Sequence, residues 1–163
     1  MFDDDYWMSQ ALAQAKKAAF KGEVPVGAIV VLNNEIIGKG FNQPISSCDP
    51  TAHAEIVALR DAAKKTSNYR IIEASLYVTL EPCTMCAGAM IHSRIKRLIY
   101  GASEPKAGVI NSQTSLLDAP YFNHKIEVVA GVCSDECSEI ISTFFVKRRE
   151  QIKIKSKKES ERK

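Results

Sequence analysis

The stretch ASLYVTLEPCTMCAGAMIHSRIKRLIYGA, residues 74–102, decides the fold of this chain. Its two ends, ASLYVTL (74–80) and RLIYGA (97–102), have the composition of strands, and the segment between them favours a helix that Pro82 opens and that runs through about Ser93. Strands that alternate with helices predict a layered α/β sheet.

The residues before this stretch extend the pattern. Residues 4–21 place apolar side chains at helical spacing, and Gly22 follows as a stop signal. GAIVVL (27–32) and EIIGKGFN (35–42) are β-branched runs separated by two asparagines, which tolerate the left-handed conformations of a tight hairpin turn. We therefore expect a helix followed by two antiparallel strands.

Three more elements complete the expected fold. Asp49 and Pro50 have the residue types of an N-cap and a first helical position, and the run TAHAEIVALRDAAKK after them favours a helix. IEVVAGV (126–132) is expected as a last strand, and Ser134 as the cap of a long helix from Asp135 into the tail. The fold class that follows is α/β, a three-layer α-β-α sandwich around a mixed, roughly five-stranded sheet.

Length and composition predict one soluble domain. The 163 residues suit a single core, and no internal repeat or Gly/Ser-rich linker divides them. We expect a single domain over residues 1–150 and a frayed basic tail over 151–163. No apolar run approaches the roughly 20 residues of a membrane span, and the acidic, amphipathic N-terminus lacks the features of a secretory signal, so we expect a cytoplasmic protein with no membrane partner.

The charge is unevenly distributed. Of the net charge of +3, residues 147–163 contribute nine Lys or Arg and three Glu, which is +6, so the remaining 146 residues sum to −3. A basic arm on a mildly acidic body is typical of nucleic-acid binders, because each cation near a phosphate releases a counterion. A solvated tail that aids solubility would have the same composition, and both interpretations stay open on charge alone.

Cys83 and Cys86 supply two thiols at the i, i+3 spacing that brings side chains together on a helix. Such a pair can be a redox pair, half of a zinc site, or two small core residues. His53 and Glu55 stand near the start of another expected helix. His53, Cys83 and Cys86 would leave one coordination position for water, as catalytic zinc sites do, and Glu55 is then the candidate general acid and base.

The other cysteines and histidines are weaker candidates. A thioredoxin-like redox pair follows the first strand of its fold and lacks a paired His-x-Glu motif. The remaining residues stand apart from that motif, so we expect the cysteines among them to be core residues and the histidines to be structural: Cys48, Cys133, Cys137, His92 and His124. Zinc suits two thiolates and one imidazole best, although iron and cobalt also accept these ligands.

His53-Ala54-Glu55 and Pro82-Cys83-Thr84-Met85-Cys86 resemble the H-x-E and P-C-x-x-C motifs of the zinc-dependent nucleobase deaminase superfamily. The resemblance extends over nearly the whole chain to the bacterial tRNA adenosine deaminase family. It is carried by EVPVGAIVV, GFNQPISSCDPTAHAE, NYRIIEASLYVTLEPCTMCAGAMIHSRI and STFFVKRRE.

This resemblance implies a cytidine deaminase-like fold and a zinc-dependent hydrolase. The expected reaction converts the wobble adenosine of a tRNA anticodon to inosine by zinc-hydroxide attack on C6, with Glu55 as the proton shuttle and release of ammonia. It also implies one Zn2+ per subunit on His53, Cys83 and Cys86, a homodimer, and the tRNA anticodon stem-loop as partner.

The resemblance also implies a substrate-binding set. Asn42 is expected to hydrogen-bond the flipped base or its ribose, the backbone of Ala54 to contact the base edge, and Val26 to pack on the base. Without the resemblance, Asn42 would be a turn residue at a strand end.

The last helix is expected to contact the RNA. Phe144 and Phe145, followed by Lys147, Arg148 and Arg149, resemble the family's contacts to flanking nucleotides and phosphates. Adjacent helical residues point about 100° apart, so we expect one phenylalanine inside and the other nearer the RNA. In YGASEPKAGV the family pattern has Asp at the position of Glu104, which leaves the role of Glu104 open.

Two rival functions remain on the sequence alone. A deaminase of free cytosine, cytidine or guanine needs the same zinc core and no basic arm. A zinc-stabilised RNA-binding module without catalysis needs the arm and no Glu55.

Overall fold

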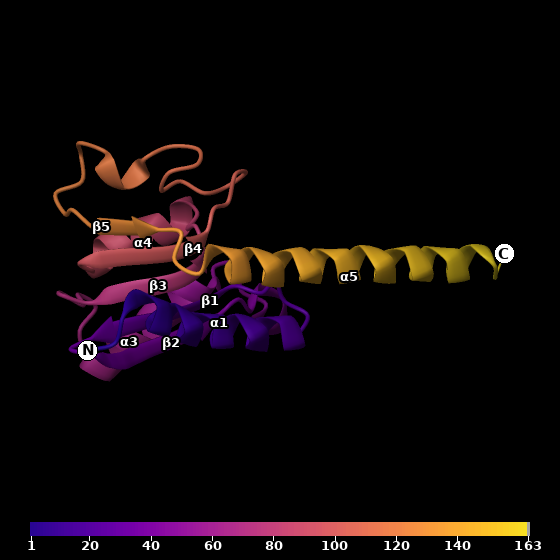
Figure 1. The fold of residues 1–163 in the computed structure, drawn as a ribbon, viewed down its shortest axis with the longest axis horizontal. Coiled ribbons are helices and arrows are strands. Elements are labelled where there is room, and N and C mark those ends of the chain that lie inside the picture. Colours follow the sequence, from indigo (N-terminus) through magenta and orange to yellow (C-terminus); the bar gives the residue numbers. More distant parts are fainter. Residues whose placement is uncertain (163) are drawn as a thin grey trace.

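The computed structural model describes residues 1–162, which form a five-stranded sheet between two layers of helices (Figure 1). The elements in chain order are α1 (Asp4–Phe20), β1 (Gly27–Leu32), β2 (Glu35–Phe41), α2 (Pro44–Ser47), α3 (Ala54–Thr66), β3 (Ser75–Leu80), α4 (Thr84–Ser93), β4 (Arg97–Ala102), a short 3-10 helix η1 (Leu116–Asp118), β5 (Glu127–Ala130) and α5 (Ser134–Ser160).

The sheet is mixed, with strand order β2-β1-β3-β4-β5. β1 pairs antiparallel with both β2 and β3, while β3, β4 and β5 run parallel. The predicted mixed sheet of about five strands is therefore confirmed. Because β2, β3, β4 and β5 all run the same way, their carboxyl ends meet at one edge of the sheet, and this edge carries the candidate site.

The hairpin between β1 and β2 has the turn expected from its two asparagines. Asn33 and Asn34 have φ angles of 51° and 61°. Left-handed conformations at both central positions define the turn type that matches the twist of two paired strands. The sequence therefore predicted this turn from the residue types alone.

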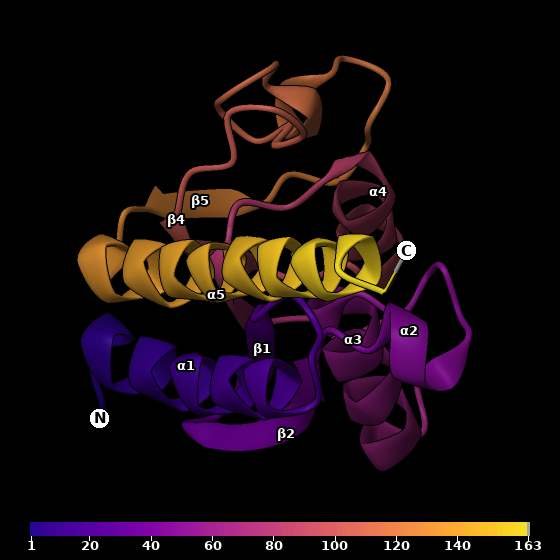
Figure 2. The ribbon, with the colours of Figure 1, turned by 90° about the vertical axis from the view of Figure 1, so that its right-hand side faces the viewer.

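Helices cover both faces of the sheet, so the three-layer prediction is confirmed (Figure 2). α1 and α5 pack on one face, where Met8, Ile29 and Ile99 are buried in one apolar cluster. α3 and α4 pack on the other face, over a larger cluster that includes Leu76 and Met90. Each strand of the sheet centre thus buries residues on both sides, as strands covered by helices on both faces must.

α3 approaches the sheet closely because β2 contains glycine where the helix begins. A Cβ atom built on Gly40 would lie 2.3 Å from the carbonyl oxygen of Ala54, so a larger residue does not fit without moving the helix. This contact fixes the first turn of α3 against the end of β2. The first turn of α3 carries Glu55, and the preceding residue is His53.

Three helix starts differ from the prediction. α3 begins at Ala54 with His53 as N-cap, because Asp49 closes a local turn in which its side chain accepts hydrogen bonds from the backbone and hydroxyl of Thr51. A separate short helix, α2, precedes that turn. The other two are smaller shifts: α4 begins two residues after Pro82, and α5 is capped by the residue before Ser134.

α5 extends far beyond the body of the protein (Figure 1). Its 27 residues correspond to about 40 Å of helix. The tail expected to fray is helical up to Ser160, since Ser134–Ser160 contains no Gly or Pro to interrupt the helix. Residue 150 lies inside this helix, and the division into a domain over 1–150 and a tail over 151–163 stays a prediction. Within residues 1–162, no helix is long and apolar enough to span a membrane.

Candidate metal centre and substrate site

Two helix N-termini meet at the edge of the sheet where the parallel strands end. His53 is the N-cap of α3 and Cys83 is the N-cap of α4, and both have extended backbone conformations. Cys86 lies in the first turn of α4 and is buried. The short segment from the end of β3 through Pro82 leads directly into Cys83, so sheet and helix together fix the positions of both thiols.

The structure brings the three predicted ligands together. His53 Nδ1 lies 3.6 Å from the Sγ atom of Cys83 and 3.6 Å from that of Cys86, and all three ligand atoms lie within 4.8 Å of one another. Tetrahedral zinc with its usual bond lengths would separate a histidine nitrogen from a cysteine sulfur by about 3.6 Å. The donor set and its spacing therefore fit a zinc ion.

The electrostatics of the group suit a cation. The pKa of Cys83 is lowered because Cys86 and His53 both hydrogen-bond its sulfur, which outweighs the effect of burial. The pKa of Cys86 is raised because its thiol donates a hydrogen bond to the sulfur of Cys83 and because Cys86 is buried. A divalent cation that binds to both sulfur atoms and the imidazole displaces the proton between the two sulfur atoms. The N-termini of α3 and α4 also favour thiolate charge.

Glu55 lies beside the three ligands and is nearly inaccessible, with 4% of its surface exposed. Burial raises its pKa to about 7, with the negative charge on Cys83 acting in the same direction. A carboxyl group poised near neutral pH can both accept and donate protons. The predicted position of Glu55 beside the ligand group is therefore observed, and its catalytic role stays a prediction.

Asn42 joins β2 to the start of α3. Its side-chain oxygen accepts a hydrogen bond of 2.9 Å from the backbone N–H of Ala54, between His53 and Glu55. The N–H of Ala54 is thus already paired in this structure, and the amide nitrogen of Asn42 is the group left for a ligand. Val26, just before β1, is almost fully buried in the cluster under α3. Direct contacts of these residues with a base remain predictions.

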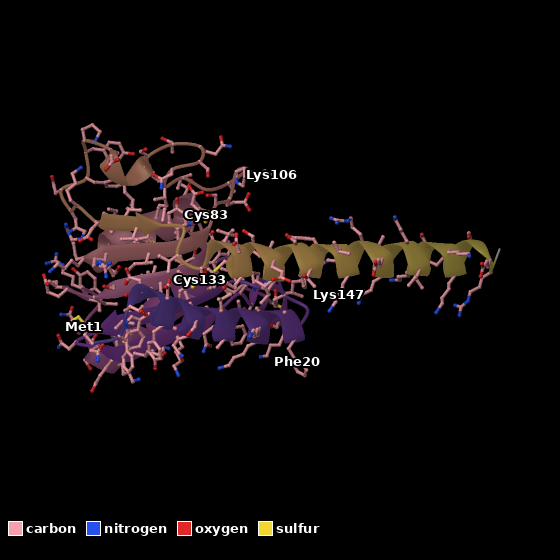
Figure 3. All side chains as sticks on the ribbon, in the orientation of Figure 1. Met1, Phe20, Cys83, Lys106, Cys133 and Lys147 are labelled. Carbon is pink, nitrogen blue, oxygen red and sulfur yellow. The ribbon has the colours of Figure 1, made fainter. Side chains whose placement is uncertain are left out.

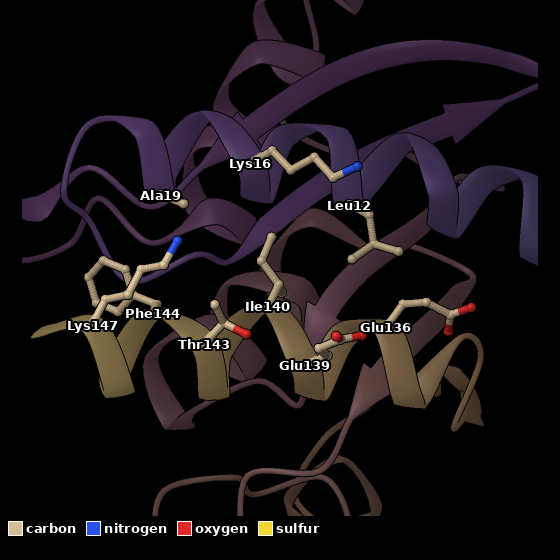
Figure 4. Close-up of a pocket in the computed structure, with 9 residues that line it drawn as sticks. All are labelled: Leu12, Lys16, Ala19, Glu136, Glu139, Ile140, Thr143, Phe144 and Lys147. Carbon is tan, nitrogen blue, oxygen red and sulfur yellow. The ribbon is translucent and has the colours of Figure 1, made fainter.

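The aromatic and basic residues of α5 lie beyond the body of the sheet. Phe144 is half-buried against α1, where it helps to line a hollow of about 550 Å3 with Leu12, Lys16 and Lys147 (Figure 4). Phe145 is exposed, as expected for one of two adjacent helical residues. The guanidinium of Arg148 lies 5.8 Å from the centre of the Phe144 ring. Their contacts with RNA stay predictions.

Sequence reasoning missed two buried glutamates that shape this edge. Glu81 accepts hydrogen bonds from the loop after β4, which keep its pKa low against the opposing effect of burial. Glu23 accepts hydrogen bonds from the backbone N–H groups of Ile45 and Ser46 at the start of α2. Charged residues in the apolar contexts of GEVPVG and TLEPC were the available signal, since a buried carboxylate requires donors.

The residues left out of the site are placed only partly as predicted, since Cys133 is half-buried and His92 is exposed. Within residues 1–162, His53, Cys83 and Cys86 form the only group suited to hold a metal. Cys137 is buried and His124 is bonded to the carbonyl of Ile95 at 2.6 Å. Cys48 is exposed, so its assignment to the core is wrong: it ends α2 in a left-handed conformation at the surface.

Known proteins share this sequence and fold. The sequence pattern of the MafB19-like deaminase family matches residues 2–149. A tRNA-specific adenosine deaminase of Haemophilus influenzae is 55% identical over 152 residues, which cover 93% of this chain and 88% of that protein. One of Bacillus subtilis is 43% identical over 161 residues, which cover 99% of this chain and 100% of that protein.

Solved structures agree with these relatives. A structure from a study of A-to-I editing by tRNA:A34 deaminases at the wobble position superposes with a TM-score of 0.80 at 41% identity, over 83% of this chain and 98% of that one. A guanine deaminase from Nitrosomonas europaea superposes with a TM-score of 0.77 at 22% identity, over 88% and 85% of the two chains. The second likeness is one of fold alone.

Proposed function

Because this chain belongs to the family of tRNA-specific adenosine deaminases, we propose that it hydrolyses the wobble adenosine of a tRNA anticodon to inosine and ammonia. The observation that carries this proposal is the group of His53, Cys83 and Cys86 with the buried carboxyl of Glu55 beside it. The substrate is inferred from the relatives, and the type of reaction is inferred from the geometry of the site.

His53, Cys83 and Cys86 would hold one zinc ion per chain, through the Nδ1 atom of the imidazole and two thiolates. When bound, zinc supplies the Lewis acidity that makes water a nucleophile near neutral pH. Two thiolates neutralise much of the charge of the ion, so a neighbouring base contributes more here than beside three histidines. Glu55 is that base.

Glu55 moves the protons of the reaction. Hydrolysis adds water at C6 of adenine and expels the 6-amino group, so both protons of the water must leave its oxygen, one for the ring nitrogen and one for the departing amine. A carboxyl group with a pKa near neutrality can accept each of these protons in turn and pass it to the substrate. Its charge state is restored at the end of each cycle.

The surroundings of Glu55 would receive the base. Asn42 holds the first turn of α3 through the N–H of Ala54 and offers its amide nitrogen to the base or ribose. Val26 and Ala54 would form the apolar wall and backbone edge of the pocket. A target base must leave its stack to reach such a recessed site, which is easiest in an anticodon loop.

The exposed part of α5 would bind the anticodon stem-loop. Phe145 offers an aromatic face, and Lys147, Arg148 and Arg149 offer charges to the phosphates. We further propose that the protein works in the cytoplasm as a homodimer, on the basis of its resemblance to the family. The net charge of +6 over residues 147–163 supports an RNA partner for the arm.

The proposal is tested by incubating zinc-loaded protein with a tRNA that has adenosine at the wobble position, then sequencing the RNA for inosine. We expect conversion at this position, none in a matched tRNA with guanosine there, and little with free adenosine. Unchanged adenosine in the tRNA would refute the proposal. Full activity on a free base with none on RNA would point to a nucleobase deaminase instead.

A further inference from the structure

Glu81 is a buried carboxylate with no part in the chemistry proposed above. It follows β3, lies two residues before Cys83 and is only 3% exposed. Five donors surround it: the backbone N–H groups of Glu104 (3.0 Å), Ile110 (3.1 Å), Asn111 (2.8 Å) and Ser112 (2.9 Å), and the hydroxyl of Ser112. Within residues 1–162, no ion pair includes it.

All of these donors belong to the segment from Glu104 to Ser112, which contains no helix or strand. A segment without regular structure has no ladder to pair its N–H groups, and Glu81 accepts four of them. The segment also closes tightly over the carboxylate, because a Cβ atom on Gly108 would lie 2.4 Å from Cδ of Glu81. The N–H of Val109 donates to the carbonyl of Pro82 at 3.1 Å.

These contacts place the segment beside the metal group. β3 and β4 are parallel, so the residues that follow them, Glu81 to Cys83 and the segment after Ala102, leave the sheet at the same edge. Val109 and Ile110 are buried in the cluster that also contains Cys86. Lys106 is exposed at the outer tip of the segment, on the same side of the body as Lys147 of α5 (Figure 3).

We infer that Glu81 is a positioning residue, which fixes the segment from Glu104 to Ser112 at the rim of the metal group in the conformation that receives the RNA. The inference rests on the proposed function. Glu81 acts through this segment and does not itself touch the substrate. One oxygen of the carboxylate accepts from the three backbone N–H groups of residues 110–112. The other accepts from the N–H of Glu104 and the hydroxyl of Ser112, so the carboxylate joins both ends of the segment and sets the outer tip with Lys106 from both sides.

Glu81→Gln tests the role with almost no change in size. The amide oxygen can keep the bonds from the backbone N–H groups of residues 110–112, and the hydroxyl of Ser112 can turn to accept from the new NH2 group. The backbone N–H of Glu104 also faces this NH2 group, and two donors cannot pair. The Glu104 end is then released. We expect KM for the anticodon stem-loop to rise about tenfold while kcat at saturation and the zinc content of one per chain stay nearly constant, as for a loss of uniform binding.

A double-mutant cycle with Lys106→Ala separates positioning from general stability. Lys106→Ala alone should raise KM and reduce the slope of binding against salt concentration by about one phosphate contact. In the Glu81→Gln background it should add little, because Lys106 is no longer held in place. Lys65→Ala, an exposed lysine in the last turn of α3 at the opposite edge, should change neither quantity.

Three results would overturn the inference: strictly additive effects of the two substitutions, a loss of zinc in Glu81→Gln, or a fall in kcat with KM unchanged. Equilibrium binding of the stem-loop, measured by fluorescence anisotropy, gives the same cycle without turnover. If the wild-type protein binds the RNA with the expected coupling but forms no inosine, the proposed reaction fails and the positioning role stands. If it forms inosine and the cycle is additive, only the positioning role fails.

Discussion

Replacing Glu55 by glutamine should remove the proton carrier and leave the site otherwise intact. Glu55 is almost fully buried, and glutamine has the same shape, so no cavity forms. The three metal ligands are other side chains, and the bond between Asn42 and the N–H of Ala54 does not involve Glu55. We therefore expect Glu55→Gln to bind zinc and tRNA as the wild type does.

The expected loss is one of rate. A general acid or base contributes about 10²–10⁴ in rate, which is about 3–5 kcal/mol of activation free energy. Glu55 would serve both the attack of water and the departure of ammonia, so we expect kcat to fall toward the upper part of this range. Single-turnover deamination of a wobble-adenosine tRNA with excess enzyme measures this quantity directly.

The same substitution should stabilise the metal-free protein at high pH. The pKa of Glu55 is raised from 4.5 to about 7, so the folded state binds the proton more tightly than the unfolded state, and stability falls as the pH rises from about 4.5 to 7. This cost reaches about 3 kcal/mol at pH 8 and is about 1 kcal/mol at pH 5. Glutamine removes it at both values.

Urea unfolding of the metal-free wild type and variant at pH 5 and pH 8 gives the comparison, with zinc analysis of the loaded proteins as the control. The advantage of the variant should grow between the two pH values. Retention of kcat within about tenfold would show that Glu55 is not the proton carrier. A variant that is less stable than the wild type at pH 8 would show that the buried, ionised Glu55 does not destabilise the metal-free protein.

Three further changes test the surroundings of this group. Cys86→Ser should lower the zinc content well below one per chain and abolish inosine formation, because serine is a poor zinc ligand, while the exposed Cys48→Ser should retain both; equal metal contents would argue against the ligand set. Asn42→Ala should reduce the free energy of unfolding by about 1 kcal/mol, through the unpaired N–H of Ala54, and should raise KM as well; a change in stability alone would confine Asn42 to structure. Deletion of residues 150–163 should weaken tRNA binding and flatten its dependence on salt, whereas an unchanged slope would mean that the arm is only solvated.

Local patterns predicted the parts of the fold that depend on local residues. The hairpin at Asn33 and Asn34 follows from two residues that tolerate positive φ, and the strands follow from their apolar runs. The ligands could also be found, because His-x-Glu and Cys-x-x-Cys each place their side chains within one turn at a helix start. Only the three-dimensional structure shows that the Nδ1 atom of His53 lies 3.6 Å from each of the two cysteine sulfur atoms.

The errors have a different physical origin. The helix expected from Pro50 begins at Ala54, because the side chain of Asp49 closes a turn that competes with the helix. Glu81 and Glu23 were missed because their partners are backbone N–H groups 22–31 residues away, and every residue type except proline carries such a group. The roles of such residues depend on how loops return to the sheet edge.

Hydrolysis is tested by following the oxygen atom of the product. The zinc-loaded protein converts a wobble-adenosine tRNA in water enriched in oxygen-18, and the digested nucleosides are weighed by mass spectrometry. The proposed hydrolysis predicts inosine that carries one heavy oxygen at C6 for each adenosine lost, with one equivalent of ammonia, and no product from Glu55→Gln on the same time scale. Inosine without the heavy oxygen, or no inosine at all, would contradict it.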